Sequence, residues 1–87
     1  MDNFYEHLSP EDVQVLDSLS ILLIELRESR IALLSHYDVD DESSLLEKIR
    51  SGEIDEHPAY EAYLGAKYIQ STREAIRKKL KDYMLEM

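Results

Sequence analysis

Apolar residues recur through the first half of the chain at the three- and four-residue intervals of an α-helix. Neither Gly nor a second Pro interrupts this pattern up to about residue 36. The segment Ser9-Pro10-Glu11-Asp12 supplies the signals of a helix start: a hydroxyl that can cap the first turn, Pro at the first helical position, and two carboxylates near the positive end of the helix dipole. We therefore predict a helix over residues 10–36.

One line of apolar positions on this helix forms a heptad-like seam, in which Arg30 occupies one of the otherwise apolar positions. Further apolar residues, among them Val15, Leu22 and Ile31, widen the apolar surface beyond one narrow face. A helix with so wide an apolar surface needs partners on more than one side. Two helices cover only part of it, so we expect a second copy of the chain to complete a four-helix core with twofold symmetry. The predicted dimer interface consists of Leu16, Leu19, Leu23, Leu26, Arg30 and Leu33.

A short second helix is predicted over residues 41–50. It begins within a break at residues 38–44, whose first five positions include four acids. Asp40 or Asp41 can cap its first turn, because a carboxylate at that position accepts hydrogen bonds from free backbone N–H groups. Gly52 follows a basic last turn and suits the left-handed position that ends many helices.

A third helix is predicted over residues 58–85, with Pro58 at its first position and apolar residues again at helical spacing. Strand-like alternation appears nowhere over a useful length. We therefore predict an all-α fold in which residues 1–87 form a single helical domain. It is an antiparallel hairpin of two long helices with a short helix in the connection, and it pairs into a dimeric four-helix-type bundle.

The first half of the third predicted helix combines small residues with tyrosines. Ala62, Gly65 and Ala66 form a notch that another helix can approach closely. Tyrosine is favoured where one end of the side chain is buried and the other is wet, as in a core margin or a protein interface. Both interpretations remain open from the sequence, and the residues predicted to bind a partner protein are Tyr60, Tyr63 and Tyr68.

Composition excludes several classes of protein. The 87 residues contain no Cys, which removes disulfide scaffolds, thiolate zinc sites, cysteine nucleophiles and iron–sulfur clusters. Apolar runs such as residues 21–24 are far too short to span a membrane. The N-terminal segment is acidic and lacks the apolar stretch of a signal peptide. We therefore expect a soluble, cytoplasmic protein that does not bind membranes.

Charge is unevenly distributed along the chain. The net charge is −9, from 19 acidic and 10 basic residues. Residues 67–87 nevertheless carry six bases and three acids. The basic residues within 73–81 suit the C-terminal half of a helix, or a solvated face that pairs with acids on a neighbouring helix. We favour these two structural roles over the alternative, an anchor for nucleic acid or an acidic partner. A strongly negative chain repels phosphate, so we do not expect nucleic acid to be a partner.

Candidate catalytic and metal-binding groups are sparse. His57 and Glu61 are four residues apart and can share a helix face, but no Glu-x-x-His motif lies on a predicted helix. Ser35 and His36 are adjacent, and neighbours on a helix point to different faces. Nucleophile elbows, phosphate-binding loops and dinucleotide fingerprints are all missing from the sequence. We therefore predict a protein that is not an enzyme and that holds neither a cofactor nor a metal.

The sequence favours a small, acidic, non-catalytic interaction module, which dimerises through its first long helix and binds a protein partner whose identity the sequence does not reveal. Two alternatives stay open. One is a regulator linked to nucleic acid, such as an antitoxin-like protein or an acidic DNA mimic, because dense carboxylates can imitate phosphate spacing. The other is a metal-binding helical bundle centred on His57 and Glu61.

Overall fold

The first long helix, α1, begins where the side chain of Ser9 caps it. The computed structural model of the chain describes residues 8–86, and α1 extends over Pro10–Ser35. The Asp12 backbone N–H donates to Ser9 Oγ at 3.1 Å, and the Ser9 N–H donates to the Asp12 carboxylate at 3.3 Å. This reciprocal capping box satisfies two backbone donors that the start of a helix leaves without partners.

The end of α1 is a Schellman turn centred on an aspartate. Asp38 has a left-handed backbone with φ 57°. Its N–H donates to Ser35 O at 3.0 Å, while the N–H of Val39 donates to Leu34 O at 3.2 Å. Leu34 and Val39 belong to one buried cluster, which is the apolar contact that accompanies this motif. The turn thereby directs the chain back onto the hairpin.

The short helix α2 extends over Glu42–Arg50 and is defined by local signals at both ends. The Asp41 side chain accepts a hydrogen bond from the Ser44 N–H at 2.7 Å, so the second of the two candidate aspartates forms the cap. Gly52 ends the helix with φ 77°, and its N–H donates to Ile49 O at 3.2 Å. A side chain would strain this left-handed position, which explains the glycine.

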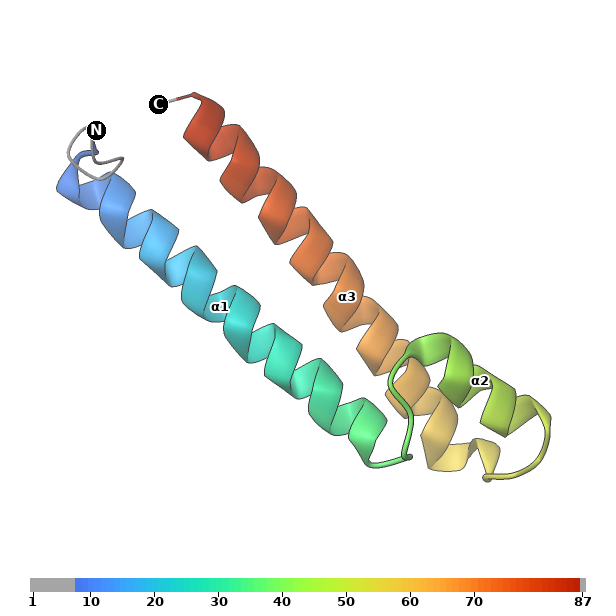
Figure 1. Cartoon of the computed structure of the whole chain (residues 1–87). Helices are drawn as coiled ribbons and strands as arrows, with labels where there is room; N and C mark the ends of the chain where they lie inside the picture. The colour runs from blue at the N-terminus through green and yellow to red at the C-terminus, as the bar shows by residue number, and fades with distance from the viewer. Residues whose placement is uncertain (1–7, 87) are drawn as a thin grey trace.

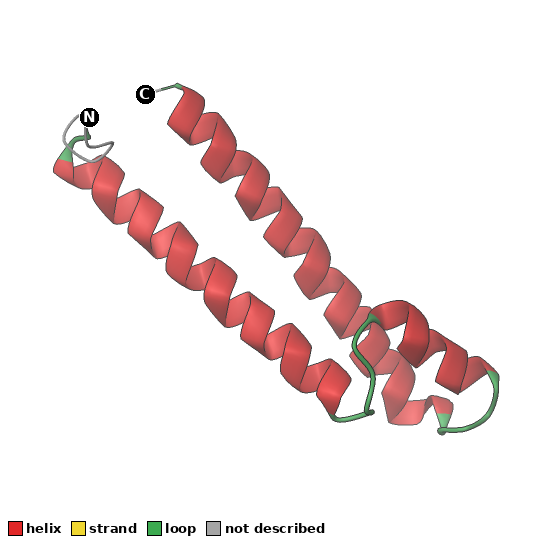
Figure 2. Ribbon diagram, viewed as in Figure 1, coloured by secondary structure: helices red, strands yellow, loops and turns green. Residues whose placement is uncertain are grey.

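The second long helix, α3, extends over Glu56–Leu85, with a non-helical residue, His57, in its first turn. The His57–Pro58 peptide bond is cis, and regular helical geometry continues from Pro58. Figure 1 shows α1 and α3 side by side and antiparallel, with the start of α1 and the end of α3 at one end of the molecule and α2 folded against α3 at the other. The result is a rod of 55 × 22 × 18 Å. Figure 2 shows helices and loops as the elements of residues 8–86, which confirms the all-α hairpin.

The apolar core is concentrated at the closed end of the rod, where α2 covers the hairpin. Leu34 and Leu45 are fully buried, and Val39 and Ala66 complete the cluster. In the half of the hairpin with the start of α1 and the end of α3, here called the open end, the described elements are these two helices. Leu16 is the buried apolar residue of that half within the described chain. A core of this size gives an isolated chain only marginal stability.

A polar contact joins the two long helices at the open end. The Tyr83 hydroxyl, near the end of α3, donates a hydrogen bond to the Asp12 carboxylate in the first turn of α1. This bond lowers the pKa of Asp12 below its usual value and raises the pKa of Tyr83. The contact fixes the relative register of the helix ends where few apolar side chains do so.

The small-residue notch of α3 faces α1 of the same chain. Ala66 is fully buried, and a Cβ built on Gly65 would lie 3.6 Å from Leu33 Cδ1, an ordinary van der Waals contact. We expect Gly65→Ala to raise the free energy of unfolding by about 1 kcal/mol, because alanine is the better helix former and meets no clash. Urea denaturation at a fixed protein concentration measures the change. A loss of stability would mean that α1 approaches more closely than this contact requires.

Candidate interaction surfaces

The heptad-like seam of α1 lies on the inner side of the hairpin. Leu16 is buried, and the remaining five predicted interface residues are half-buried, already within a single chain. The Leu23 carbonyl accepts a hydrogen bond from Arg73 of α3, and Arg30 pairs with Glu42 next to α2. The chain therefore uses much of this seam for its own packing, and a second copy can reach only the outer edge.

The outer surface of α1 is unusually apolar. Large apolar side chains lie on α1 to either side of the face that packs against α3. They are between 39% and 56% exposed. A helix that is apolar almost all the way round is normally buried on several sides. Neither α3 nor α2 covers these positions, which are Val15, Ile21, Leu22, Ile24 and Ile31.

One of these flanks forms a continuous stripe, which we call the leucine face. From Val15 to Leu26 its residues follow one another on α1 at alternating four- and three-residue steps, and Leu33 follows Leu26 by seven, the spacing of a helix–helix contact. Leu19, Leu26 and Leu33 are its half-buried inner edge, while Val15 and Leu22 are exposed. The leucine face consists of Val15, Leu19, Leu22, Leu26 and Leu33.

On α3, Ile69 and Ile76 continue the leucine face, because they follow Gly65 by four and eleven residues and so share its side of the helix. The short helix α2 packs elsewhere on α3, along a hollow lined by Tyr63, Lys67 and other residues. Lys67 lies two residues from Gly65, which places it about 160° around the helix. The leucine face is therefore on the side of the hairpin that α2 leaves uncovered.

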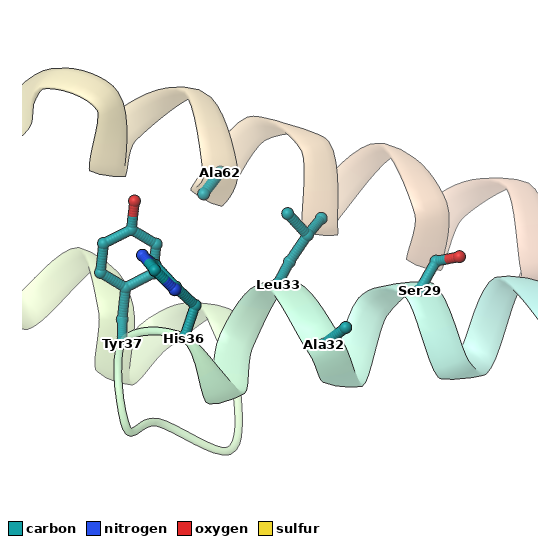
Figure 3. A pocket seen from close by; sticks show the side chains of 6 residues that line it. All are labelled: Ser29, Ala32, Leu33, His36, Tyr37 and Ala62. Carbon is teal, nitrogen blue, oxygen red and sulfur yellow. The ribbon is translucent and has the colours of Figure 1, made fainter.

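A shallow apolar hollow marks the end of the leucine face nearest the turn. Figure 3 shows Leu33 pointing from α1 toward α3, with Ala62 on the facing turn and His36 beside Tyr37. The His36 and Tyr37 rings meet edge to face, with centroids 4.9 Å apart. Such a hollow can accept an apolar side chain from a partner. Its full lining is Ser29, Ala32, Leu33, His36, Tyr37 and Ala62.

The three predicted partner-binding tyrosines do not lie together. Tyr60 and Tyr63 stack with ring centroids 5.7 Å apart, and Lys67 Nζ lies 5.5 Å from the Tyr63 centroid. These two tyrosines line a hollow beside α2 that also includes Arg50. Tyr68 is 74% exposed and lies five residues after Tyr63, about 140° around the helix. The structure thus brings two of the three residues to one surface and places the third elsewhere.

The candidate metal ligands form only a simple pair. His57 Nδ1 lies 3.3 Å from Glu61 Oε1, and both side chains are mostly exposed. Within residues 8–86, nowhere do three His, Cys, Asp or Glu side chains gather closely enough to hold a metal ion. The pair therefore lacks the third ligand that structural and catalytic sites normally use.

Several residues of the acidic run between α1 and α2 have structural roles. Asp38 forms the turn and Asp41 the cap described above, while Glu42 reaches back to α1. Arg30 Nε lies 2.5 Å from Glu42 Oε1, and Arg30 Nη2 lies 2.9 Å from Oε2. This two-pronged geometry is the strongest form of an arginine–carboxylate pair. Both side chains are about four-fifths buried, so water screens the pair only weakly.

The Arg30–Glu42 pair predicts a dependence of stability on pH. The hydrogen bond from Arg30 lowers the pKa of Glu42 below its usual value of 4.5. A carboxyl group whose pKa is lowered by folding stabilises the protein above its unfolded pKa, and this stabilisation disappears as the pH falls through the folded pKa. We expect Glu42→Gln to cost about 1–2 kcal/mol at pH 7 and much less at pH 3. Urea denaturation at the two pH values measures this, with Glu47→Gln, an exposed carboxyl of the same helix, as control. An equal cost at both pH values would contradict the prediction.

A family model described as the uncharacterized protein MJ0235 family matches residues 5–87. Neither a curated protein nor a solved structure matches the chain. No helix in the described part of the chain combines the length and the apolar character needed to cross a membrane.

Proposed function

Because the chain belongs to the uncharacterized protein MJ0235 family, we propose its role from its own surfaces: it is a non-catalytic interaction module that forms a homodimer through α1. The contact that we assign to the second copy is the leucine face. A twofold axis beside this face places two hairpins against each other and produces a four-helix bundle. This arrangement retains the outer residues of the predicted seam and adds Val15 and Leu22.

The observation that carries the proposal is the absence of charge on the leucine face. From position 15 to position 33 of α1 and from position 65 to position 76 of α3, the residues on this side of the hairpin are apolar, small or hydroxylated. The centres of protein interfaces are depleted of charge in the same way, whereas 33% of this chain is charged. These uncharged positions are Val15, Ser18, Leu19, Leu22, Leu26, Ser29, Leu33, Gly65, Ile69, Thr72 and Ile76.

The small size of the core supports the same conclusion. The apolar side chains that residues 8–86 bury almost completely include two alanines, and most of them lie at the closed end. Oligomerisation is a common way in which short chains gain the apolar burial that a single copy lacks. A second copy on the leucine face would extend the apolar core along the open end.

For the partner protein we propose the surface that carries Tyr60 and Tyr63. Tyr60 is 40% exposed, and its ring continues the stack begun by the half-buried Tyr63. Stacked tyrosines present a rigid contact area with polar ends, a combination enriched at binding hot spots. This surface lies beside α2, so it remains open when two copies associate through the leucine face.

The proposed dimer has a direct test in the solution mass of the full chain. We expect light scattering after size-exclusion chromatography to give about 20 kDa, twice the chain mass of 10.2 kDa, and the mass to fall only on strong dilution. Circular dichroism recorded on the same samples reports whether the helices persist. A helical protein of 10.2 kDa at all micromolar concentrations would contradict the proposal.

A further inference from the structure

A buried arginine lies midway along the hairpin, on the side of α3 that faces α1. Arg73 of α3 is only 8% exposed, an unusual degree of burial for an arginine. Its Nε donates one long hydrogen bond, 3.4 Å, to the Leu23 carbonyl of α1. No carboxylate of residues 8–86 forms an ion pair with it. The described chain therefore leaves most of the hydrogen-bonding capacity of this guanidinium unused.

Other arginines surround Arg73. Arg77 follows it by one helical turn on α3, and Arg27 follows Leu23 by one turn on α1. Burial lowers the pKa of Arg73, and the positive charges of Arg77, Arg27 and Arg30 lower it further. Four of the five arginines in the chain thus gather in one place. Like charges held together in this way destabilise a protein unless an anion joins them.

The terminal nitrogens of Arg73 remain accessible from outside. Among the described side chains, the one fully buried polar atom without a hydrogen-bond partner is Gln70 Oε1. The Nη nitrogens of Arg73 form no hydrogen bond to described atoms, so they must reach the surface. Neither Nη nitrogen is therefore fully enclosed by the described chain.

The chain itself shows which chemistry suits this cluster. Glu42, at the first position of α2, binds Arg30 through both carboxylate oxygens. It is the sole carboxylate of residues 8–86 that is ion-paired with any of the four arginines. Within residues 8–86, none of the other three arginines forms an ion pair with a carboxylate.

We propose that Arg27, Arg73 and Arg77 form a binding site for a carboxylate group that a protein partner supplies, as Glu42 does for Arg30. Planar guanidinium groups match carboxylates in two-pronged geometry, and low exposure strengthens each bond. Next to the site, Leu80 and Met84 line a hollow whose remaining walls include Arg77 and Lys81. An acidic residue flanked by apolar residues on the partner would fit this combination. The proposal is independent of dimerisation, because none of these three arginines belongs to the leucine face.

Nuclear magnetic resonance of the arginine side chains tests the site in the full-length protein. The Arg73 Nε–Hε resonance is followed during titration with sodium succinate at pH 7.5, and sodium chloride keeps the ionic strength constant because salt screens charge interactions. We expect a saturable shift of this resonance. In Arg77→Gln the apparent Kd should rise about tenfold or more, because one charged donor is lost. Lys78→Gln, which removes the adjacent charge from a different face of α3, should leave the Kd unchanged.

A parallel titration with sodium phosphate distinguishes a carboxylate from a phosphate ligand. Weaker binding of phosphate than of succinate supports the proposal, whereas stronger binding of phosphate would overturn the carboxylate assignment. A shift that does not saturate, or one of equal size in Arg77→Gln, would overturn the site itself. The two-dimensional spectrum of each variant shows directly whether it is folded, and Arg27→Gln provides a second variant should Arg77→Gln lose its structure.

Discussion

Leu22→Asp is expected to convert the dimer into folded monomers. Leu22 is 39% exposed in the single chain, so an aspartate at this position remains solvated in the monomer and does not disturb the hairpin core. In the proposed dimer the same carboxylate would be buried in an uncharged surface, and the twofold axis would place two of them there. Burial of an unpaired charge is strongly unfavourable. We expect a loss of about 4 kcal/mol or more in association, equivalent to a roughly thousandfold higher Kd.

Light scattering at matched concentrations measures this effect, and circular dichroism confirms that the variant keeps its helices. Ile21→Asp provides the matched control, because Ile21 is equally apolar, more exposed, and about 100° away around α1. It should leave the mass near that of the dimer. If Ile21→Asp or Ile24→Asp dissociated the protein while Leu22→Asp did not, the second copy would lie on the other flank of α1.

Leu45→Ala is expected to reduce the stability of the protein most severely. Leu45 is fully buried, and it is the residue through which α2 enters the cluster formed by Leu34, Val39 and Ala66. Truncation removes the apolar contacts and leaves a cavity that this small core cannot refill. Leucine-to-alanine changes in such positions cost about 2–5 kcal/mol, which is much of the stability available to a chain of this size.

Urea denaturation at one fixed protein concentration measures this cost, because association with a second copy adds to the apparent stability. Leu64→Ala is the control, since Leu64 is 48% exposed and alanine suits a helix at least as well. Its effect should stay within about 0.5 kcal/mol. A loss below about 1 kcal/mol in Leu45→Ala would show that α2 is not part of the cooperative core.

Local chemistry made much of the fold predictable. The cap at Ser9, the glycine stop after α2 and the proline near the start of α3 each act over a few residues, so the sequence contains their signals directly. The break after α1 was predicted, but the left-handed conformation of Asp38 was not, because an aspartate gives no signal for it comparable to glycine. The pairing of Arg30 with Glu42 was missed for another reason: it depends on how the chain folds back, not on spacing along one helix.

Helical spacing contained two signals that the prediction did not use. Arg73 was grouped with the basic residues around it, yet it follows Ile69 by four residues and precedes Ile76 by three, which places it on the inner side of α3. In the same way, the five-residue step from Tyr63 to Tyr68 already separates their faces. Periodicity could not decide whether the seam of α1 packs against its own α3 or against another copy, because both produce the same apolar pattern.

The concentration of the core at one end has a consequence for motion. Local openings of a protein follow the distribution of buried apolar contacts, and regions with few of them open at little cost in free energy. The turns around Leu34 and Leu45 therefore form the last unit to open. The first turns of α1 and the last turns of α3, at the other end of the hairpin, separate at a lower cost in free energy. In an isolated chain, the hydrogen bond from the Tyr83 hydroxyl to the Asp12 carboxylate opposes this separation of the helix ends.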